Sequence, residues 1–599
     1  MFQTFTSTAS PEQGPPRLAA LRRAMAAEGV DAFLIPRADA HQGEYVPPCD
    51  DRLAWLTGFT GSAGFCAALA GKAGVFIDGR YRTQVKAQVD LAHYTPVPWP
   101  EVKLADWLAE QLQVGSLGYD PMLHTPDQIT DLEGALPSAI TLRPVANLVD
   151  RVWPDRPAPP KGAIFVYPDS LAGESHGDKR ARIAAALRKA GQETAVLTLP
   201  DSIAWLLNIR GSDIPRNPVP HCFAVIHDDA RLTLFVDAAK LDDAVRAHLG
   251  DAVTIRPPEA FGPGLRSLSG PVRVDHGSAP VWVLHQLDDA GVQHVAGKDP
   301  CILPKACKSP AEIAATREAH LRDGAAMCRF LHWFDQQAPG GITEIDVVTA
   351  LEGFRADTNQ LRDISFETIA GTGSNGAVIH YRVTEDTNAT LQDGHLIVVD
   401  SGAQYLDGTT DITRTLPVGT VGDAEKQAFT RVLQGMIAVS RVRFPRGVAG
   451  QHLDALARAP LWMAGQDYDH GTGHGVGVFL CVHEGPQRLS RLSDIPLRPG
   501  MILSNEPGYY REGAFGIRIE NLIVVEDAPT LPGGDDHRAM LGFETLTYAP
   551  IDRRLILTDM LSTEERAWID AYHAACRDNI GPRLSGEAKI WLDAATQPL

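Results

Sequence analysis

The stretch VVDSGAQYLDGTTDITRT, residues 398–415, places two carboxylates on either side of a turn. The tract HLIVVDSGAQY (395–405) is apolar and β-branched, which predicts a buried strand, and DITRTLPVG (411–419) predicts a second strand. An Asp-Gly pair between them is typical of a turn. The stretch therefore predicts two strands that each carry a carboxylate close to the turn.

A hairpin would bring these two carboxylates together. Asp400 and Asp411 lie equally far from a midpoint between Tyr405 and Leu406, so they would face each other with Cβ atoms roughly 5 Å apart. Two carboxylates that close repel each other unless a cation lies between them. The alternative is that one is a turn residue and the other is solvated.

A second pair of strands repeats the arrangement further along the chain. LSNEPGYY (503–510) and GIRIENLIVVED (516–527) both look like strands. Glu506 and Glu520 are equidistant from Gly513, which lies in the turn between them. We therefore expect a second pair of carboxylates to face each other across a turn.

A histidine-containing tract lies between the two predicted hairpins. In HGTGHGVG (470–477), His470 and His474 are four residues apart, but the glycines make a regular helix improbable. The tract predicts a tight backbone that presents a histidine at close approach. The alternative is a flexible loop.

Together these segments supply five candidate metal ligands: Asp400, Asp411, His474, Glu506 and Glu520. Four carboxylates crowded together are too costly without cations, and two divalent ions would balance their charge. Oxygen-rich ligands with one imidazole suit Mn²⁺, and Co²⁺ or Zn²⁺ could substitute. Two ions about 3.5–4 Å apart can hold a bridging hydroxide and clamp a carbonyl, which predicts a hydrolase centre.

Composition excludes several other classes of protein. A net charge of −19 over 599 residues, with no basic run, disfavours nucleic acid and anionic membranes as partners. The eight cysteines are scattered without a CxxC motif, which argues against a disulfide scaffold or a thiolate zinc site. The N-terminus lacks a signal-peptide core, and no segment approaches 18 apolar residues. We therefore expect a cytoplasmic protein.

The order of elements upstream indicates an internal repeat. Leu-Ala-Trp-Leu at 53–56 and Ile-Ala-Trp-Leu at 203–206 each follow a helix–strand pattern, which predicts two related α/β domains, chance similarity being the alternative. Pro-rich, charged linkers fall at 153–162 and 297–313. The predicted domains are residues 1–155, 156–305 and 306–599.

The second linker also contains a helix start. Ser309, Pro310 and Glu312 have the spacing of an N-cap, a first-turn proline and a capping-box acid. They predict a long helix over about 310–337.

These motifs resemble a known family. The five ligands in this order, within HGTGHGVG, VHEGP, NEPGYY and GIRIEN, resemble the pita-bread dinuclear metallopeptidases, which include methionine aminopeptidase, prolidase and aminopeptidase P. The long, three-domain aminopeptidase P enzymes are the most similar, and the resemblance covers nearly the whole chain. It implies an α/β and α+β multidomain fold with two creatinase-like N-terminal domains and a C-terminal pita-bread catalytic domain.

The resemblance also implies an activity. Enzymes of this kind remove the N-terminal residue from peptides whose second residue is proline, and the long forms are typically homodimers. The Xaa-Pro bond is a tertiary amide without an N–H, so a dedicated pocket is needed for the ring. We expect a metal-dependent Xaa-Pro aminopeptidase that acts through a metal-bridging hydroxide, with Mn²⁺ as the favoured ion.

Family precedent assigns roles to individual residues. Asp411 and Glu520 would bridge two ions, Asp400 would bind one ion, and His474 and Glu506 would bind the other. Glu506 would also shuttle the proton of the bridging water. His380, His470 and His483 would orient the substrate and stabilise the tetrahedral oxyanion, each with a packed or solvated histidine as the alternative. Arg518 would bind the substrate or hold a carboxylate by a bidentate bond, with a plain charge on a strand as the alternative.

Two other functions stay open at this point. A prolidase restricted to Xaa-Pro dipeptides would carry the same ligands, and only the access that the upstream domains allow would distinguish it. A non-catalytic binding module on this fold is the second alternative. Loss of a ligand would favour it, and all five ligands are intact.

Overall fold

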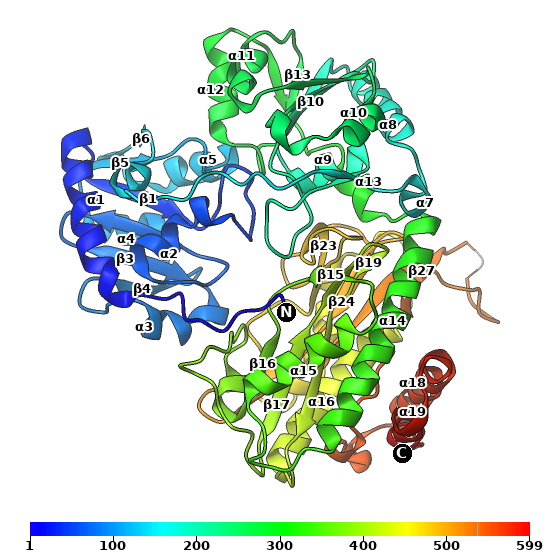
Figure 1. Ribbon diagram of the computed structural model, residues 1–599. Helices are drawn as coiled ribbons and strands as arrows, with labels where there is room; N and C mark the ends of the chain where they lie inside the picture. Colours follow the sequence, from blue (N-terminus) through cyan, green and yellow to red (C-terminus); the bar gives the residue numbers. More distant parts are fainter. Residues whose placement is uncertain (536) are drawn as a thin grey trace. The chain divides into compact units, whose positions relative to one another are not determined.

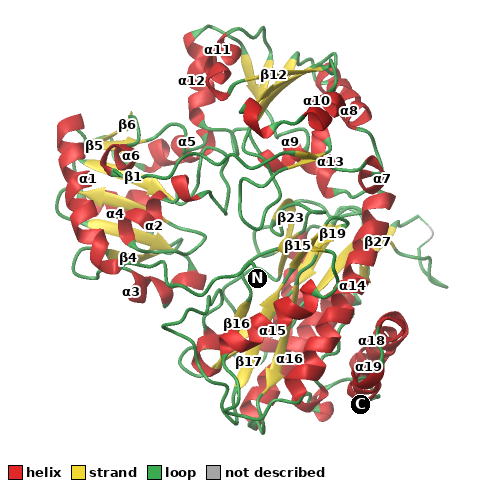
Figure 2. Ribbon diagram, viewed as in Figure 1, coloured by secondary structure: helices red, strands yellow, loops and turns green. Residues whose placement is uncertain are grey.

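The structure is a computed structural model that describes residues 1–535 and 537–599. The chain divides into two compact units, which are described separately: an N-terminal unit, Thr8–Lys305, and a C-terminal unit that contains Met1–Ser7 and Ala306–Leu599. Figure 1 follows the chain through both units, and Figure 2 shows that each combines helices with strands. The predicted α/β and α+β class is confirmed.

Two six-stranded sheets form the N-terminal unit. The first has the order β4 (Thr95–Pro98), β3 (Ala73–Ile77), β2 (Phe65–Leu69), β1 (Ala32–Pro36), β5 (Gly115–Tyr119), β6 (Ile140–Pro144). The second has the order β12 (Val253–Arg256), β11 (Leu232–Phe235), β10 (Phe223–His227), β8 (Thr194–Leu197), β13 (Val272–Val274), β14 (His294–Ala296). The short strands β7 (Phe165–Val166) and β9 (Ile209–Arg210) pair with each other.

The two sheets share one plan. In each, the three strands that come first along the chain pair antiparallel, and every further strand pairs parallel with its neighbour. The repeated Trp-containing motif lies in α2 (Arg52–Thr57), after β1, and in α9 (Pro200–Leu207), after β8. Because order, direction and motif agree, the predicted relation between the two α/β domains is confirmed.

The other helices of this unit are short and flank the strands. They are α1 (Gly14–Glu28), α3 (Gln84–Gln88), α4 (Leu104–Gln111), α5 (Pro126–Ala135), α6 (Leu148–Val152), α7 (Asp169–Ala172), α8 (His176–Lys189), α10 (Asp243–Leu249), α11 (Phe261–Arg266), α12 (Val281–Asp289) and α13 (Ile302–Ala306). None of the helices in the part of the chain that the structure describes is both long enough and apolar enough to cross a membrane.

The C-terminal unit begins with the predicted long helix, α14 (Pro310–Asp335). The Ser309 hydroxyl accepts the backbone N–H of Glu312 at 3.1 Å, and the Glu312 carboxylate accepts the N–H of Ser309 at 2.8 Å, so the predicted capping box is confirmed. The chain's first residues also belong here, since the Gln3 N–H donates to Glu352 at 3.2 Å. Residues 1–7 thus belong to the C-terminal unit.

In the described part of this unit, the strands form four sheets. They are β15 (Leu361–Ile364), β18 (Ala403–Tyr405), β19 (Gly408–Thr409); β16 (Ile369–Thr372), β17 (Leu396–Ser401), β20 (Ile412–Pro417); β25 (Gly508–Arg511), β26 (Phe515–Arg518); and β21 (Phe444–Pro445), β28 (Met540–Thr545), β27 (Asn521–Asp527), β24 (Ile502–Asn505), β22 (Gly473–Gly475), β23 (Glu484–Leu489). The remaining helices are α15 (Glu344–Ala356), α16 (Asp423–Ser440), α17 (Gly450–Trp462), α18 (Thr563–Ile580) and α19 (Gly586–Ala595).

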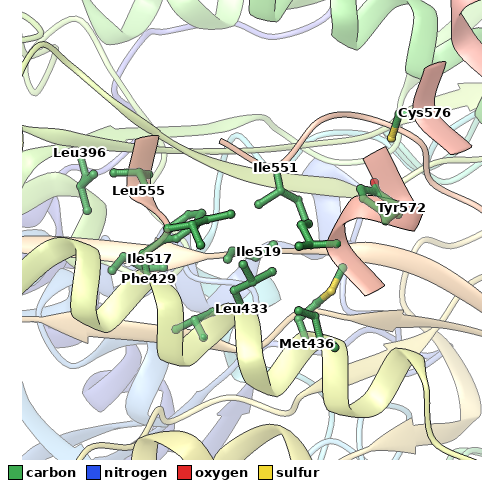
Figure 3. Packing of buried hydrophobic residues seen from close by; sticks show 14 of the residues in the cluster. Leu396, Phe429, Leu433, Met436, Ile517, Ile519, Ile551, Leu555, Tyr572 and Cys576 are labelled. Atoms are coloured by element: carbon green, nitrogen blue, oxygen red, sulfur yellow. The ribbon is translucent and has the colours of Figure 1, made fainter. Parts of the chain in front are cut away.

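A hydrophobic core lies behind the strand that leads to Glu520. Ile517 and Ile519 belong to a buried cluster in which they face α16 and the C-terminal segment. Because successive side chains of a strand point to opposite faces, Arg518 and Glu520 point the other way. Figure 3 shows the cluster, with labelled members Leu396, Phe429, Leu433, Met436, Ile517, Ile519, Ile551, Leu555, Tyr572 and Cys576.

The predicted pairing of Asp400 with Asp411 is wrong. Asp400 pairs with Thr413 in the β17–β20 ladder. Tyr405 pairs with Gly408, so the chain turns one residue later than the midpoint predicted, and a turn moved by one residue shifts every cross-strand partner by two. The strand β18 pairs with β15, and β19 pairs with β18, so neither extends the β17–β20 ladder.

Candidate metal centre

Five side chains of metal-binding type lie at strand ends of the C-terminal unit. Asp400 lies in β17, Asp411 precedes β20, His474 lies in β22, Glu506 follows β24 and Glu520 precedes β27. Asp400, Asp411 and Glu520 are buried, whereas His474 and Glu506 are half-buried. Ordinary strands normally end in solvated polar residues, so this concentration of buried acids requires an explanation.

The two glutamates face each other as the sequence predicts. Asn505 pairs with Asn521 on one side of them, and Gly508 pairs with Arg518 on the other. Both pairings share one register, and that register places the two glutamates opposite each other.

His474 lies next to two of these carboxylates, those of Asp411 and Glu506. His474 Nε2 lies 3.5 Å from Asp411 Oδ2 and 3.3 Å from Glu506 Oε1. Potential ligand atoms of Asp411, His474 and Glu520 all lie within 4.8 Å of one another. The other ring nitrogen of His474 is 3.0 Å from the carbonyl oxygen of Gly475, an arrangement in which Nδ1 donates and the Nε2 lone pair points toward the carboxylates.

Three oxygens of this cluster have no protein partner. Asp400 Oδ1, Asp411 Oδ1 and Glu520 Oε1 are buried and make no hydrogen bond within the described residues. A buried carboxylate oxygen without a partner is strongly destabilising, because it has lost its hydrogen bonds to water and no protein donor replaces them. Three such oxygens in one place have the chemistry of a divalent cation site.

Electrostatics support the same interpretation. Burial, followed by the charges of Asp400 and Glu506, raises the pKa of Asp411 well above its usual range. Burial, followed by the charge of Asp411, does the same to the pKa of Glu520. Burial also raises the pKa of Glu506, against the lowering influence of His474. A raised pKa means that burial and like charge favour the neutral form of these carboxylates, and bound cations would offset both without protonation.

Arg518 holds one of the carboxylates. Its Nη2 and Nε donate to Asp400 Oδ2 at 2.7 and 3.2 Å, and its Nη1 donates to the Tyr510 hydroxyl at 2.6 Å. Tyr510 in turn lies 2.9 Å from His470 Nε2. The predicted carboxylate contact is therefore made to Asp400, and the substrate contact of Arg518 stays a prediction.

The other predicted histidines differ in what surrounds them. The His483 ring lies 4.3 Å from the His474 ring, edge to face, which brings it to the cluster. His470 contacts the Tyr510 hydroxyl, which accepts a hydrogen bond from Arg518 and so connects His470 to the cluster. His380 is half-buried in the turn after the 3₁₀ helix Gly373–Ala377, which contacts β26.

Sequence reasoning missed two hydroxyls that support the carboxylates. Thr413 Oγ1 donates to Glu520 Oε2 at 2.8 Å, and Ser504 Oγ donates to Glu506 Oε1 at 3.0 Å. A signal for them exists, because each lies two residues from a predicted ligand and residues two apart share one face of a strand. Arg518 likewise lies two residues from the predicted ligand Glu520.

Comparison with protein-family models covers almost the whole chain. Models of the creatinase/prolidase N-terminal domain match residues 17–152 and 155–312. The model of metallopeptidase family M24 matches residues 314–527, and that of the C-terminal region of peptidase M24 matches 539–599. The chain thus has two creatinase-type domains, followed by a unit whose strands carry the carboxylates and the histidine. This combination defines a class of metallopeptidases with the pita-bread fold.

Individual proteins narrow this class. The "Probable Xaa-Pro aminopeptidase P" of Laccaria bicolor is 40% identical, over 97% of this chain and 93% of its own length. The crystal structure of X-prolyl aminopeptidase from Caenorhabditis elegans, described as a cytosolic enzyme with a di-nuclear active site, matches with a TM-score of 0.91 and 30% identity, over 98% of this chain and 100% of that chain. The chain belongs to metallopeptidase family M24, within the three-domain group of these relatives.

Smaller members of the fold cover only part of the chain. The Xaa-Pro dipeptidase of Bacillus anthracis matches with a TM-score of 0.51 and 24% identity, over 63% of this chain and 99% of its own. At this identity the likeness shows the fold alone. About a third of the present chain has no counterpart in that protein.

Proposed function

We propose that this protein is an Xaa-Pro aminopeptidase, which hydrolyses the first peptide bond of peptides with proline in second position. The observation that carries the proposal is a set of buried carboxylate oxygens, on Asp400, Asp411 and Glu520, that find no hydrogen-bond partner among the described residues. They occur in a chain similar over nearly its full length to relatives named for this activity.

We propose that two divalent ions occupy the site, with Mn²⁺ as the favoured ion and Co²⁺ or Zn²⁺ as substitutes. Asp411 and Glu520 would be shared between the ions, Asp400 would complete one site, and His474 with Glu506 would complete the other. When bound, such a pair of ions supplies a hydroxide bridging the metals at neutral pH and polarises the peptide carbonyl.

The chain's own residues would handle protons and orient the substrate. Glu506, a carboxyl with a raised pKa beside His474, is suited to accept a proton from water and return it to the leaving nitrogen. We propose that His380, His470 and His483 orient the peptide and donate to the oxygen that becomes negative. Arg518 would fix Asp400, leaving the Oδ1 oxygen of that carboxylate directed at the cations.

The test combines metal analysis with hydrolysis assays. Purified protein should contain two divalent ions per chain and cleave Xaa-Pro-Xaa tripeptides. Replacing proline by alanine in second position should lower kcat/KM by orders of magnitude, because the ring contacts and the tertiary amide geometry are lost together. A metal-free protein without peptidase activity would refute the proposal, and comparable rates on both peptides would indicate a general aminopeptidase.

A prolidase restricted to dipeptides is the second candidate function. The dipeptidase of Bacillus anthracis shares the fold over 63% of this chain, so the extra length is the feature that separates the two possibilities. Cleavage of Xaa-Pro dipeptides with no cleavage of tripeptides would favour the prolidase. We also propose a cytoplasmic homodimer, in keeping with the acidic composition and with the relative described as cytosolic.

A further inference from the structure

The C-terminal segment, residues 539–599, supplies none of the five ligands, yet it packs behind one of them. In Figure 3, Tyr572 and Cys576 of α18 and Ile551 of the preceding loop belong to the same buried cluster as Ile519, the neighbour of Glu520. This contact joins the end of the chain to the strand that carries a proposed metal ligand.

Arg414 connects the two. It lies in β20 between Thr413 and Thr415, whose hydroxyls bond to Glu520 Oε2 and to the carbonyl oxygen of Arg518. Because side chains alternate along a strand, Arg414 points to the opposite side, toward the C-terminal segment. Its side chain is almost fully buried, with 1% of its surface exposed.

The Arg414 guanidinium donates hydrogen bonds to groups next to Glu520 in both neighbouring segments. Nη1 donates to the carbonyl oxygens of Glu520 at 2.6 Å and of Thr413 at 2.8 Å, and Nη2 donates to Asn521 Oδ1 at 2.9 Å. The Glu520 N–H also donates to the Thr413 carbonyl at 3.1 Å. Arg414 therefore holds the peptide after Glu520 directly, and the peptide before Glu520 through the Thr413 carbonyl that both groups share.

The same guanidinium also donates to three oxygens of the C-terminal segment. Nη2 donates to the carbonyl oxygen of Ala549 at 2.7 Å and to the Tyr572 hydroxyl at 2.9 Å, and Nε donates to the carbonyl oxygen of Pro550 at 3.0 Å. Among the described residues, no carboxylate is a hydrogen-bond partner of Arg414. Neutral oxygens alone therefore fix the position of this buried cation, and half of them come from the C-terminal segment.

We propose that the C-terminal segment, through Tyr572 and Arg414, positions Glu520 and thereby sets the affinity of the site for divalent cations. The inference rests on the proposed metal role of Glu520. Neighbouring carboxylates repel a ligand carboxylate, so it binds a cation tightly only if its backbone is held in place. Residues outside the ligand set commonly supply that constraint.

The experiment titrates metal-free, full-length protein with Mn²⁺, and in parallel with Zn²⁺, by isothermal titration calorimetry. Tyr572→Phe removes the hydroxyl and keeps the ring, which stacks on Trp568 at 5.3 Å. Arg414→Lys keeps the charge and removes the planar fork. Ile569→Val is the matched control, since Ile569 is buried in the same helix and cluster and is not a hydrogen-bond partner of Arg414.

We expect Tyr572→Phe to weaken metal binding about 3- to 10-fold and Arg414→Lys about 10- to 100-fold, the range typical of groups that orient ligands. Ile569→Val should lower the melting temperature while its dissociation constant stays within twofold of the wild type. Saturating metal should restore most of the kcat of Tyr572→Phe on an Xaa-Pro-Xaa tripeptide, with KM unchanged.

Each contrary result has its own meaning. Wild-type protein that binds neither ion would overturn the proposed function and this inference with it. Wild-type binding that Tyr572→Phe matches would overturn this inference alone. Equal weakening in Ile569→Val would assign the effect to general destabilisation and would also overturn it.

Discussion

The carboxylates of the site govern what single substitutions should do. Asp411 is buried, has one oxygen without a partner, and lies within reach of both His474 and Glu520. In the proposed site, cations would stabilise this carboxylate more than protein groups do, so its charge should matter more than its shape.

Asp411→Asn should lower metal content and nearly abolish turnover. The amide keeps the size of the side chain, but it removes one of the negative charges that hold the cations and presents an N–H₂ group that cannot ligate. Metal analysis by mass spectrometry and a tripeptide assay on the same preparation check this. A variant that kept two ions and ordinary activity would contradict the proposed site.

His380→Ala should separate chemistry from metal binding. If His380 donates to the oxygen that becomes negative, kcat should fall by roughly 10²–10³, with both metals and the melting temperature kept. If the residue is only packed, the melting temperature should fall while kcat of the folded fraction stays normal. Metal content, melting temperature and kcat measured together distinguish the two outcomes.

At the scale of elements, one buried ion pair anchors the loop that carries His483. Lys308 Nζ pairs with the Glu484 carboxylate, both side chains being almost fully buried. Glu484 also pairs through its backbone with Gly475, next to His474. The pair therefore joins the start of the C-terminal unit to β23, which begins directly after His483 and pairs with the strand that carries His474.

Lys308→Met should destabilise the protein by about 3–5 kcal/mol, because it removes the cation that pairs with the buried Glu484 carboxylate. Adding Glu484→Gln should restore much of that loss, since the buried negative charge is then removed as well. Chemical unfolding of the wild type, both single variants and the double variant measures the coupling. Additive effects of the two substitutions would show that the pair contributes little.

The docking of α18 should depend on pH through His573. Burial, then the charges of Arg414 and Arg553, lower the pKa of His573 to about 4. Its Nε2 accepts the Ile551 N–H at 3.2 Å, which requires a neutral ring. The unfolded chain takes up a proton near its ordinary pKa of about 6.5, whereas the folded protein does not until about pH 4.

Stability should therefore be lost as the pH falls from about 6.5 to about 4, by about 3 kcal/mol in total from this group. His573→Gln, which can still accept the N–H, should show a shallower loss over the same window. Urea midpoints of both proteins between pH 7 and pH 4.5 measure the difference. Parallel pH profiles would mean that His573 is not the group responsible.

At the scale of the whole molecule, the assembly state follows from the resemblance to long aminopeptidase P enzymes. We expect a homodimer, and light scattering at micromolar concentration should give twice the mass of one chain. The segment 542–556, which follows the last proposed ligand, contains the end of β28 and the 3₁₀ helix Arg553–Leu555. A monomer at that concentration would contradict the expected assembly.

Several features were predictable because local chemistry fixes them. The capping box at Ser309 determines where α14 begins, the apolar period determines the strands, and Glu506 and Glu520 face each other because a short turn separates them. The repeated Trp motif likewise indicated two related α/β domains, which the matching strand orders confirm. Each of these depends on residues close together in sequence.

The sequence by itself determined the set of candidate metal ligands, which are four carboxylates and one histidine. Four negative charges in one place repel each other too strongly unless cations are present. The tertiary structure alone decided the partners of these groups. It paired Asp400 with Thr413, attached Arg518 to Asp400, and placed Arg414 between Glu520 and Tyr572. Such choices join residues more than a hundred positions apart, or depend on a one-residue shift of a turn. They follow from packing of the whole unit, because no local pattern records which distant atom satisfies a buried polar group.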